Sequence, residues 1–148
     1  METAIDDKTR LEVRRHFNTT VAKVYAALTD PEQMKYWMAP NDAFAESEVT
    51  LDARVGGRYR IVMHAPDGET FRVGGVFREI VPDRKLVYTW AWESTPERES
   101  LVTLELSAAG DGTDLVLTHQ RLADVEARDK HLQGWIGCLD RLGNFLCR

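Results

Sequence analysis

The sequence is poor in cysteine and has no long apolar run, and both absences narrow the class of protein. Its two cysteines, Cys138 and Cys147, fall in one predicted helix, about 13 Å apart along the axis and too far apart to form a disulfide with each other. We therefore expect two thiols. The first residues form no apolar signal region, and no segment approaches the roughly 18 apolar residues of a membrane span. These absences predict a cytoplasmic protein without a membrane span.

A surplus of positive charge is also absent. The 148 residues carry 19 Lys and Arg against 24 Asp and Glu, a formal net charge of −5. Nucleic-acid binding needs a positive face, so we expect no nucleic-acid partner. A content of 43% hydrophobic and 29% charged residues is typical of a folded globular chain. The length fits one domain, which we place at residues 11–148 after a flexible polar leader, residues 1–10.

Motifs for metal and nucleotide chemistry are missing. The four histidines show no metal-ligand spacing, and no Cys-x-x-Cys pair occurs. The sequence also lacks a Gly-x-Ser-x-Gly elbow, a phosphate-binding loop and a dinucleotide fingerprint. We therefore predict no metal and no cofactor.

The most informative segment that is present is the last one, residues 122–146. Apolar residues recur on one side of a 3.6-residue period, which predicts a long amphipathic helix whose stripe is buried against a large surface. Gly143 lies in this stripe, and we expect the helix backbone to approach the sheet closely there. Trp135, near the middle of the helix, is the residue that we expect to face a ligand.

The order of the other elements predicts the architecture. A strand over residues 11–17 precedes a helix over 18–28, and Asp30 with Pro31 is typical of the start of a second short helix. About six strands follow, beginning with a weak one at 47–51, and most are linked by hairpin turns. We predict an α+β fold in which a curved antiparallel sheet wraps around the C-terminal helix.

A helix about 10–12 Å across does not fill the concavity of a curled sheet, so we expect a cavity beside it. The inward faces of the predicted strands are unusually aromatic, as small-molecule sites are, although each residue taken singly also fits plain core packing. The predicted ligand-binding residues are Trp37, Met38, Tyr59, Ile61, Met63, Phe71, Tyr88, Trp90, Trp92, Leu104, Leu117, His119, Trp135 and Leu139.

His119 and Glu79 are the weak catalytic candidates. Strand alternation turns His119 inward, where its ring either meets a ligand or is satisfied by the backbone. Glu79 lies either at the cavity rim or beside an arginine such as Arg15, and acid–base work requires that it approach His119. Arg15 itself is either paired with a carboxylate or part of the pocket. No catalytic residue is assigned on this basis.

Motifs along residues 11 to 148 resemble a known family. They are Arg15 with Phe17, Val24-Tyr-Ala-Ala-Leu-Thr-Asp-Pro31, Tyr36-Trp37 with Pro40, Val55-Gly-Gly57, Met63 with Pro66-Asp-Gly68, Gly75 with Glu79, Leu86-Val-Tyr-Thr-Trp90, Leu117-Thr-His119, and Gly134-Trp135 with Leu139-Asp-Arg-Leu142. In this order they resemble the homologues of the activator of the heat-shock-protein-90 ATPase, in the START-like, or SRPBCC, superfamily. The resemblance implies a helix-grip fold with a hydrophobic cavity.

The resemblance does not imply one function, because this superfamily includes carriers, cyclases, resistance proteins and the chaperone activator domain. Our leading hypothesis is a protein that binds a hydrophobic small molecule, lipid-like or aromatic, in its cavity. The alternatives are a chaperone-interacting module and an enzyme of the cyclase or hydrolase type that uses His119. The sequence does not decide whether the chain forms a homodimer.

Overall fold

The computed structural model describes residues 8–147, so most of the predicted leader lies outside the described residues. The strands are β1 (Leu11–Phe17), β2 (Glu48–Leu51), β3 (Arg58–His64), β4 (Thr70–Val81), β5 (Lys85–Trp92), β6 (Ser100–Ala109) and β7 (Gly112–Gln120). The helices are α1 (Val21–Thr29), α2 (Pro31–Trp37) and α3 (Val125–Leu146). The predicted order of strand, two short helices, six strands and long helix is confirmed.

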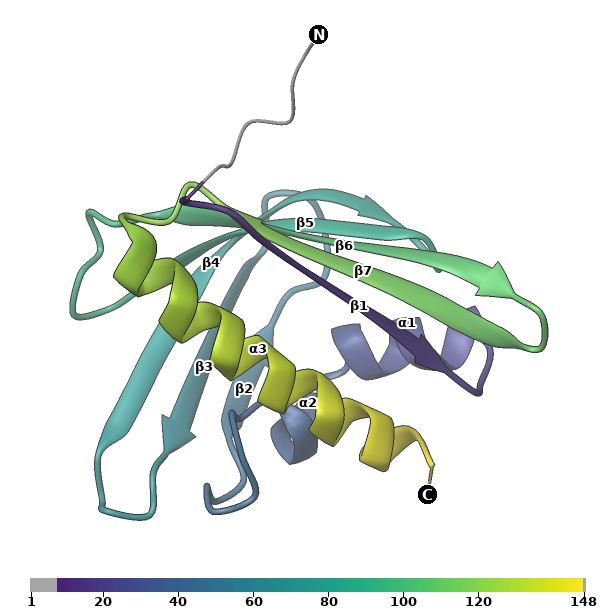
Figure 1. Ribbon diagram of the computed structural model, residues 1–148, viewed down its shortest axis with the longest axis horizontal. Helices are drawn as coiled ribbons and strands as arrows, with labels where there is room; N and C mark the ends of the chain where they lie inside the picture. Colours follow the sequence, from purple (N-terminus) through teal and green to yellow (C-terminus); the bar gives the residue numbers. More distant parts are fainter. Residues whose placement is uncertain (1–7, 148) are drawn as a thin grey trace, which may run out of the picture.

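The strands form one antiparallel sheet with the order β1-β7-β6-β5-β4-β3-β2. Its register shifts between Phe77 and Glu79, at a bulge in β4. Gly75, two residues before the bulge, lies so close to β5 that a Cβ there would meet the carbonyl oxygen of Thr89 at 2.0 Å. Bulges bend a strand and increase its twist, and the sheet curls strongly along β4, as Figure 1 shows.

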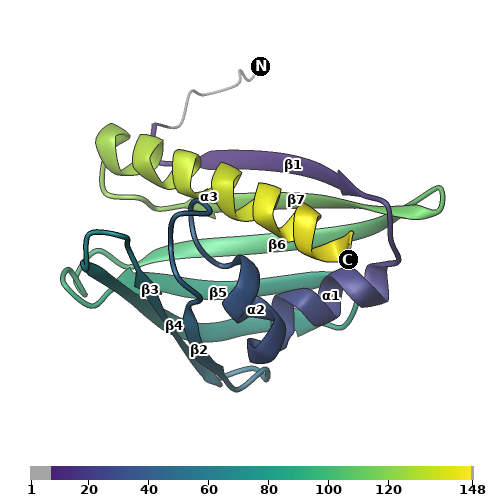
Figure 2. The same cartoon turned by 90° about the horizontal axis from the view of Figure 1, so that it is seen from below.

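The two short helices follow β1 in tandem and cover one end of the sheet (Figure 2). Asp30 ends α1 and caps α2, since its carboxylate accepts a hydrogen bond from the backbone N–H of Glu32 at 2.9 Å. Gln33 reaches back to the same carboxylate at 3.1 Å. The first contact satisfies a backbone donor at the helix N-terminus, the second joins two side chains of the same turn, and the cap confirms the helix start that the sequence predicts.

The long helix α3 lies diagonally across the concave face of the sheet, as both ribbon views show. It begins at Val125 rather than at Leu122, because Asp124 caps it by accepting from the N–H of Ala127 at 2.8 Å. Its buried residues include Trp135, Leu139 and Leu142, which pack into the core formed by the sheet. The predicted helix-grip fold is thereby confirmed. No helix within residues 8–147 is long and apolar enough to cross a membrane.

The expected close approach at Gly143 is wrong, and Gly137 makes it instead. A Cβ on Gly143 would make only an ordinary contact of 3.6 Å with the ring of Phe17. A Cβ on Gly137 would lie 1.8 Å from the carbonyl oxygen of Pro40, in the segment after α2. Among the three glycines of α3, the one that lies close to another backbone therefore faces this loop and not the sheet, which the periodicity of α3 alone could not indicate.

Candidate functional site

Two hollows lie between α3 and the sheet. The larger one, about 340 Å³ in volume, opens to solvent and is called the open pocket. The smaller one, about 20 Å³, lies deeper and is described as the inner cavity. The inner cavity is about large enough for one water molecule, so of these two hollows only the open pocket has room for an organic ligand.

The structure distributes the predicted ligand-binding residues over both hollows, and the expected single cavity is divided. The open pocket is lined by Met38, Met63, Phe71, Trp90, Trp92 and Trp135. The inner cavity is lined by Trp37, Tyr59, Ile61, Tyr88, Leu104, Leu117 and Leu139, and Met38 and Trp135 border it as well. His119 lines neither hollow.

Aromatic packing explains why the inner part is filled. The ring of Tyr59 packs against Phe77 and Tyr88 with centroids 5.8 and 5.1 Å apart. Its hydroxyl donates to the carbonyl oxygen of Thr89, and burial raises the pKa of Tyr59 well above its ordinary value. These rings pack against one another and leave almost no space between them, so the residues around the inner cavity form a packed core.

Six residues of the open pocket were not predicted from the sequence: Pro40, Phe44, Lys130, His131, Gly134 and Cys138. Four of the pocket residues on α3 follow the spacing i, i+3, i+4 and i+7 at His131, Gly134, Trp135 and Cys138, so they share one helix face. That spacing was available in the sequence. Pro40 and Phe44 come from the connection between α2 and β2, for which the sequence carries no comparable signal.

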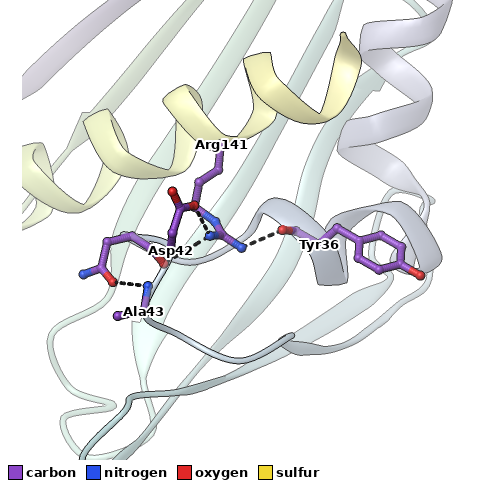
Figure 3. Close-up of polar contacts among 5 residues, drawn as sticks. Tyr36, Asp42, Ala43 and Arg141 are labelled. Atoms are coloured by element: carbon purple, nitrogen blue, oxygen red, sulfur yellow. Dashed lines mark hydrogen bonds and ion pairs between the residues drawn. The ribbon is translucent and has the colours of Figure 1, made fainter. Parts of the chain in front are cut away.

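The connection between α2 and β2 forms one wall of the open pocket and is tied to α3 by Arg141. The guanidinium donates to the backbone oxygens of Tyr36 and Asn41 at 2.7 and 3.2 Å and to the carboxylate of Asp42 at 2.6 Å (Figure 3). Figure 2 shows this connection reaching up to α3. Together with the contact of Gly137 with Pro40, these bonds hold the wall in place.

His119 is fully buried and forms a hydrogen-bonded chain with its neighbours. The indole N–H of Trp135 donates to its Nδ1 at 3.0 Å, and its Nε2 lies 2.7 Å from the hydroxyl oxygen of Ser100. That hydroxyl donates its own proton to the carbonyl oxygen of Trp90 at 3.1 Å. Nε2 must then carry the ring proton and donate it, so the chain requires a neutral imidazole.

His131 is held in the same way at the edge of the open pocket. Its Nδ1 donates to the carbonyl oxygen of Ala127 at 2.7 Å, and its Nε2 accepts from the indole N–H of Trp92 at 2.9 Å. Burial lowers the pKa of His131. Burial, aided by the nearby His131, lowers the pKa of His119 to about 3. Both rings are therefore neutral near pH 7.

This arrangement does not favour acid–base catalysis. Both ring nitrogens of His119 are occupied by protein partners, and Glu79 lies on β4, three strands away from β7 in the sheet. Glu79 forms an ion pair with Lys85 at 3.3 Å. Arg15 forms an ion pair with Asp140 at 3.2 Å, which confirms the alternative in which Arg15 is paired with a carboxylate. No cluster of three His, Cys, Asp or Glu side chains suited to a metal ion occurs among the described residues.

Comparison with known families agrees with this architecture. The family model described as "Activator of Hsp90 ATPase homolog 1-like protein" matches residues 18–146. The chain belongs to this family. The human protein "Activator of 90 kDa heat shock protein ATPase homolog 1" is 26% identical to it over 127 residues, which cover 85% of this chain and 33% of the human protein. The chain therefore spans about a third of the length of that relative.

Solved structures of bacterial proteins share the fold. A protein from Rhodobacter sphaeroides is 28% identical, with a TM-score of 0.82 and coverage of 97% of this chain and 96% of that one. CalU16 from Micromonospora echinospora is 30% identical, with a TM-score of 0.70 and coverage of 93% and 75%. Protein CV1439 from Chromobacterium violaceum, 24% identical with a TM-score of 0.82 and coverage of 93% and 96%, supports the fold alone.

Proposed function

We propose that this protein binds a small hydrophobic molecule, aromatic or lipid-like, in the open pocket. The observation that carries the proposal is the open pocket itself, about 340 Å³ in volume and lined by three of the chain's four tryptophans. Sites for small molecules are concave, mostly apolar and about 300–1,000 Å³ in volume. The volume lies at the small end of that range, which favours a small ligand.

The charge of the lining supports an uncharged or weakly polar ligand. Lys130 is the one charged residue among the described lining residues. Its side chain is exposed, and its Nζ lies 3.9 Å from Oε1 of Glu126. His131, the other titratable nitrogen group there, is neutral and already bonded to protein atoms. A fully ionised ligand would lose its hydration without gaining a buried partner, which costs free energy.

Gly134 allows a sharp test of the site. A Cβ at this position would meet no described atom within 4 Å beyond its own helical turn, because the position faces the open pocket. Gly134→Leu should fill the pocket without disturbing the core, since leucine also favours a helix more than glycine does. Gly143→Ala, on the same helix and away from the pocket, is the matched control.

The experiment combines thermal unfolding with native mass spectrometry against naphthalenes, flavones and medium-chain fatty alcohols. A compound that binds only the native state stabilises it by about 2.7 kcal/mol at a concentration 100 times its Kd. The melting temperature rises as a result. We expect such a compound to shift the wild type and Gly143→Ala but not Gly134→Leu. If no compound shifts the wild type, or if Gly134→Leu binds equally well, the proposal is wrong.

The human relative's name supports a second candidate, contact with a chaperone ATPase. The similarity covers a third of that relative, so its activity cannot be carried over without a test. The purified protein should then change the ATPase rate of a heat-shock-protein-90 chaperone in a saturable way. An unchanged rate at concentrations well above that of the chaperone would reject this function.

A further inference from the structure

Trp90 is the one tryptophan of the four whose indole N–H has no hydrogen-bond partner within residues 8–147. Trp37 donates to the carbonyl oxygen of Ala27 at 3.0 Å, Trp92 donates to His131, and Trp135 donates to His119. The Trp90 side chain lines the open pocket, and the residue is only 4% exposed. An unpaired buried N–H is costly and rare in native proteins, so its presence needs a reason.

The surroundings of Trp90 offer it rings rather than acceptor atoms. Its indole packs edge to face against Trp92 at 5.5 Å and against His119 at 5.6 Å, and it lies tilted on Trp135 at 5.1 Å. Contacts of an N–H with an aromatic face are weaker than a hydrogen bond to oxygen. The nitrogens of both neighbouring histidines are already occupied, so no side-chain acceptor in this aromatic cluster is free for Trp90.

The members of this aromatic cluster differ in how far they are buried. Trp92 and His131 are partly exposed, whereas Trp90, Trp135 and His119 are buried. We therefore expect a ligand that reaches the Trp90 nitrogen to displace the Trp92–His131 pair rather than the buried rings. An indole nitrogen donates and cannot accept, so the ligand atom must be an acceptor.

We propose that the Trp90 indole N–H is the polar anchor of the open pocket, and that the ligand is a planar, largely apolar molecule with a carbonyl or similar neutral acceptor at its buried end. This inference rests on the proposed function and sharpens it from hydrophobic molecules in general to aromatic ketones and their relatives. The rings around the pocket supply stacking surfaces, and the N–H selects for the acceptor. Saturated lipid chains without an acceptor at the buried end fit this site less well.

The test compares fluorenone with fluorene, two planar probes that differ by a carbonyl in place of a methylene group. Calorimetric titration should show the wild type binding fluorenone about five- to tenfold more tightly, the value of one net hydrogen bond. Trp90→Phe keeps an aromatic ring but removes the donor, so it should bind both probes with equal affinity. Trp37→Phe, which removes an indole donor from the packed core outside the open pocket, should keep the preference for fluorenone.

The wild type allows a direct measurement that does not depend on how well the variants fold. Each of the four indole N–H groups gives its own signal in a proton–nitrogen correlation spectrum, assignable in the wild type from its through-space contacts with neighbouring residues. Fluorenone should move the Trp90 signal downfield as a new hydrogen bond forms, whereas fluorene should not.

The outcomes separate the two proposals. Equal binding of both probes by the wild type, a preference that survives Trp90→Phe, or a Trp90 signal that does not move with fluorenone overturns the anchor and leaves hydrophobic binding standing. If neither probe binds and no other compound of the screen does so, the proposed function fails and the anchor fails with it.

Discussion

The indole N–H of Trp135 on α3 donates to Nδ1 of His119 on β7 at 3.0 Å, and this bond joins the long helix to the sheet in the buried interior. Trp135 also borders both the open pocket and the inner cavity. The same bond therefore stabilises the fold and orients one wall of the pocket.

Substitution of Trp135 separates the hydrogen bond from the packing. Trp135→Phe should lower the free energy of unfolding by about 1–3 kcal/mol, because Nδ1 of His119 then stays buried without a donor. Trp135→Ala should cost about 3–5 kcal/mol, because the side chain is 3% exposed and leaves a cavity. Urea denaturation measures both, and an equal loss for the two variants would mean that the ring volume contributes nothing.

Stability should depend on pH through His119. Burial lowers the pKa of His119 to about 3 from its ordinary value of 6.5. Below pH 6.5 the unfolded chain binds a proton that the native state does not, so stability falls as the pH drops toward 3 and is unaffected by this group above pH 6.5. Between these two pKa values, one such group changes the free energy of unfolding by about 1.4 kcal/mol per pH unit.

The difference in pH dependence between the wild type and a His119 variant isolates the contribution of His119. Urea denaturation of the wild type and of His119→Gln between pH 7 and pH 4.5 should show a smaller loss of stability in the variant, even if the variant is less stable at pH 7. His131, whose pKa burial also lowers, remains in both proteins and cancels in the comparison. Parallel pH profiles would show that His119 is not held neutral in the native state.

Two glycines of α3 should respond to alanine in opposite directions. Gly134→Ala should raise the free energy of unfolding by about 0.5–1 kcal/mol, since alanine favours the helix and its methyl group enters the open pocket. Gly137→Ala should lower it by about 1–3 kcal/mol, because the added Cβ displaces the carbonyl group of Pro40. Thermal unfolding of both variants provides the measurement, and shifts of the same sign would contradict the geometry.

Removal of the Arg141 side chain should loosen the wall formed by the connection between α2 and β2. Arg141→Met keeps the apolar stem but loses the bonds to Tyr36, Asn41 and Asp42, and we expect a loss of about 2–3 kcal/mol. Hydrogen exchange of residues 39–46 should become faster in the variant. Arg14→Met, at an exposed arginine, should stay within about 0.5 kcal/mol of the wild type and leave that exchange unchanged.

The two thiols should react at very different rates. Cys138 is buried beside the open pocket, and burial raises the pKa of its thiol to about 12, whereas Cys147 is exposed. Since the thiolate is the reactive form, an aromatic disulfide reagent at pH 8 should modify one thiol quickly and the second only after unfolding. Cys147→Ser should abolish the fast phase. Two equally fast thiols in the native wild type would contradict this burial.

The fold could be predicted in large part because its signals are local. The alternation in β1, the cap at Asp30 and the apolar stripe of α3 each depend on residues within a few positions of one another. The order of the elements then left few ways to cover the apolar face of the sheet. Even so, the expected close contact at Gly143 was wrong, since the partner of Gly137 lies in a distant loop.

The amino-acid sequence by itself determined the strands, the helices and an aromatic interior, because backbone preference and hydrophobic periodicity act over short distances. Only the tertiary structure decided which aromatic residues fill the core and which border open space. Tyr59 and Tyr88 close the inner cavity against each other, while Trp90 and Trp92 stay beside the open pocket with partners from α3. These choices depend on side chains that are far apart in the chain and meet only when α3 packs into the curved sheet.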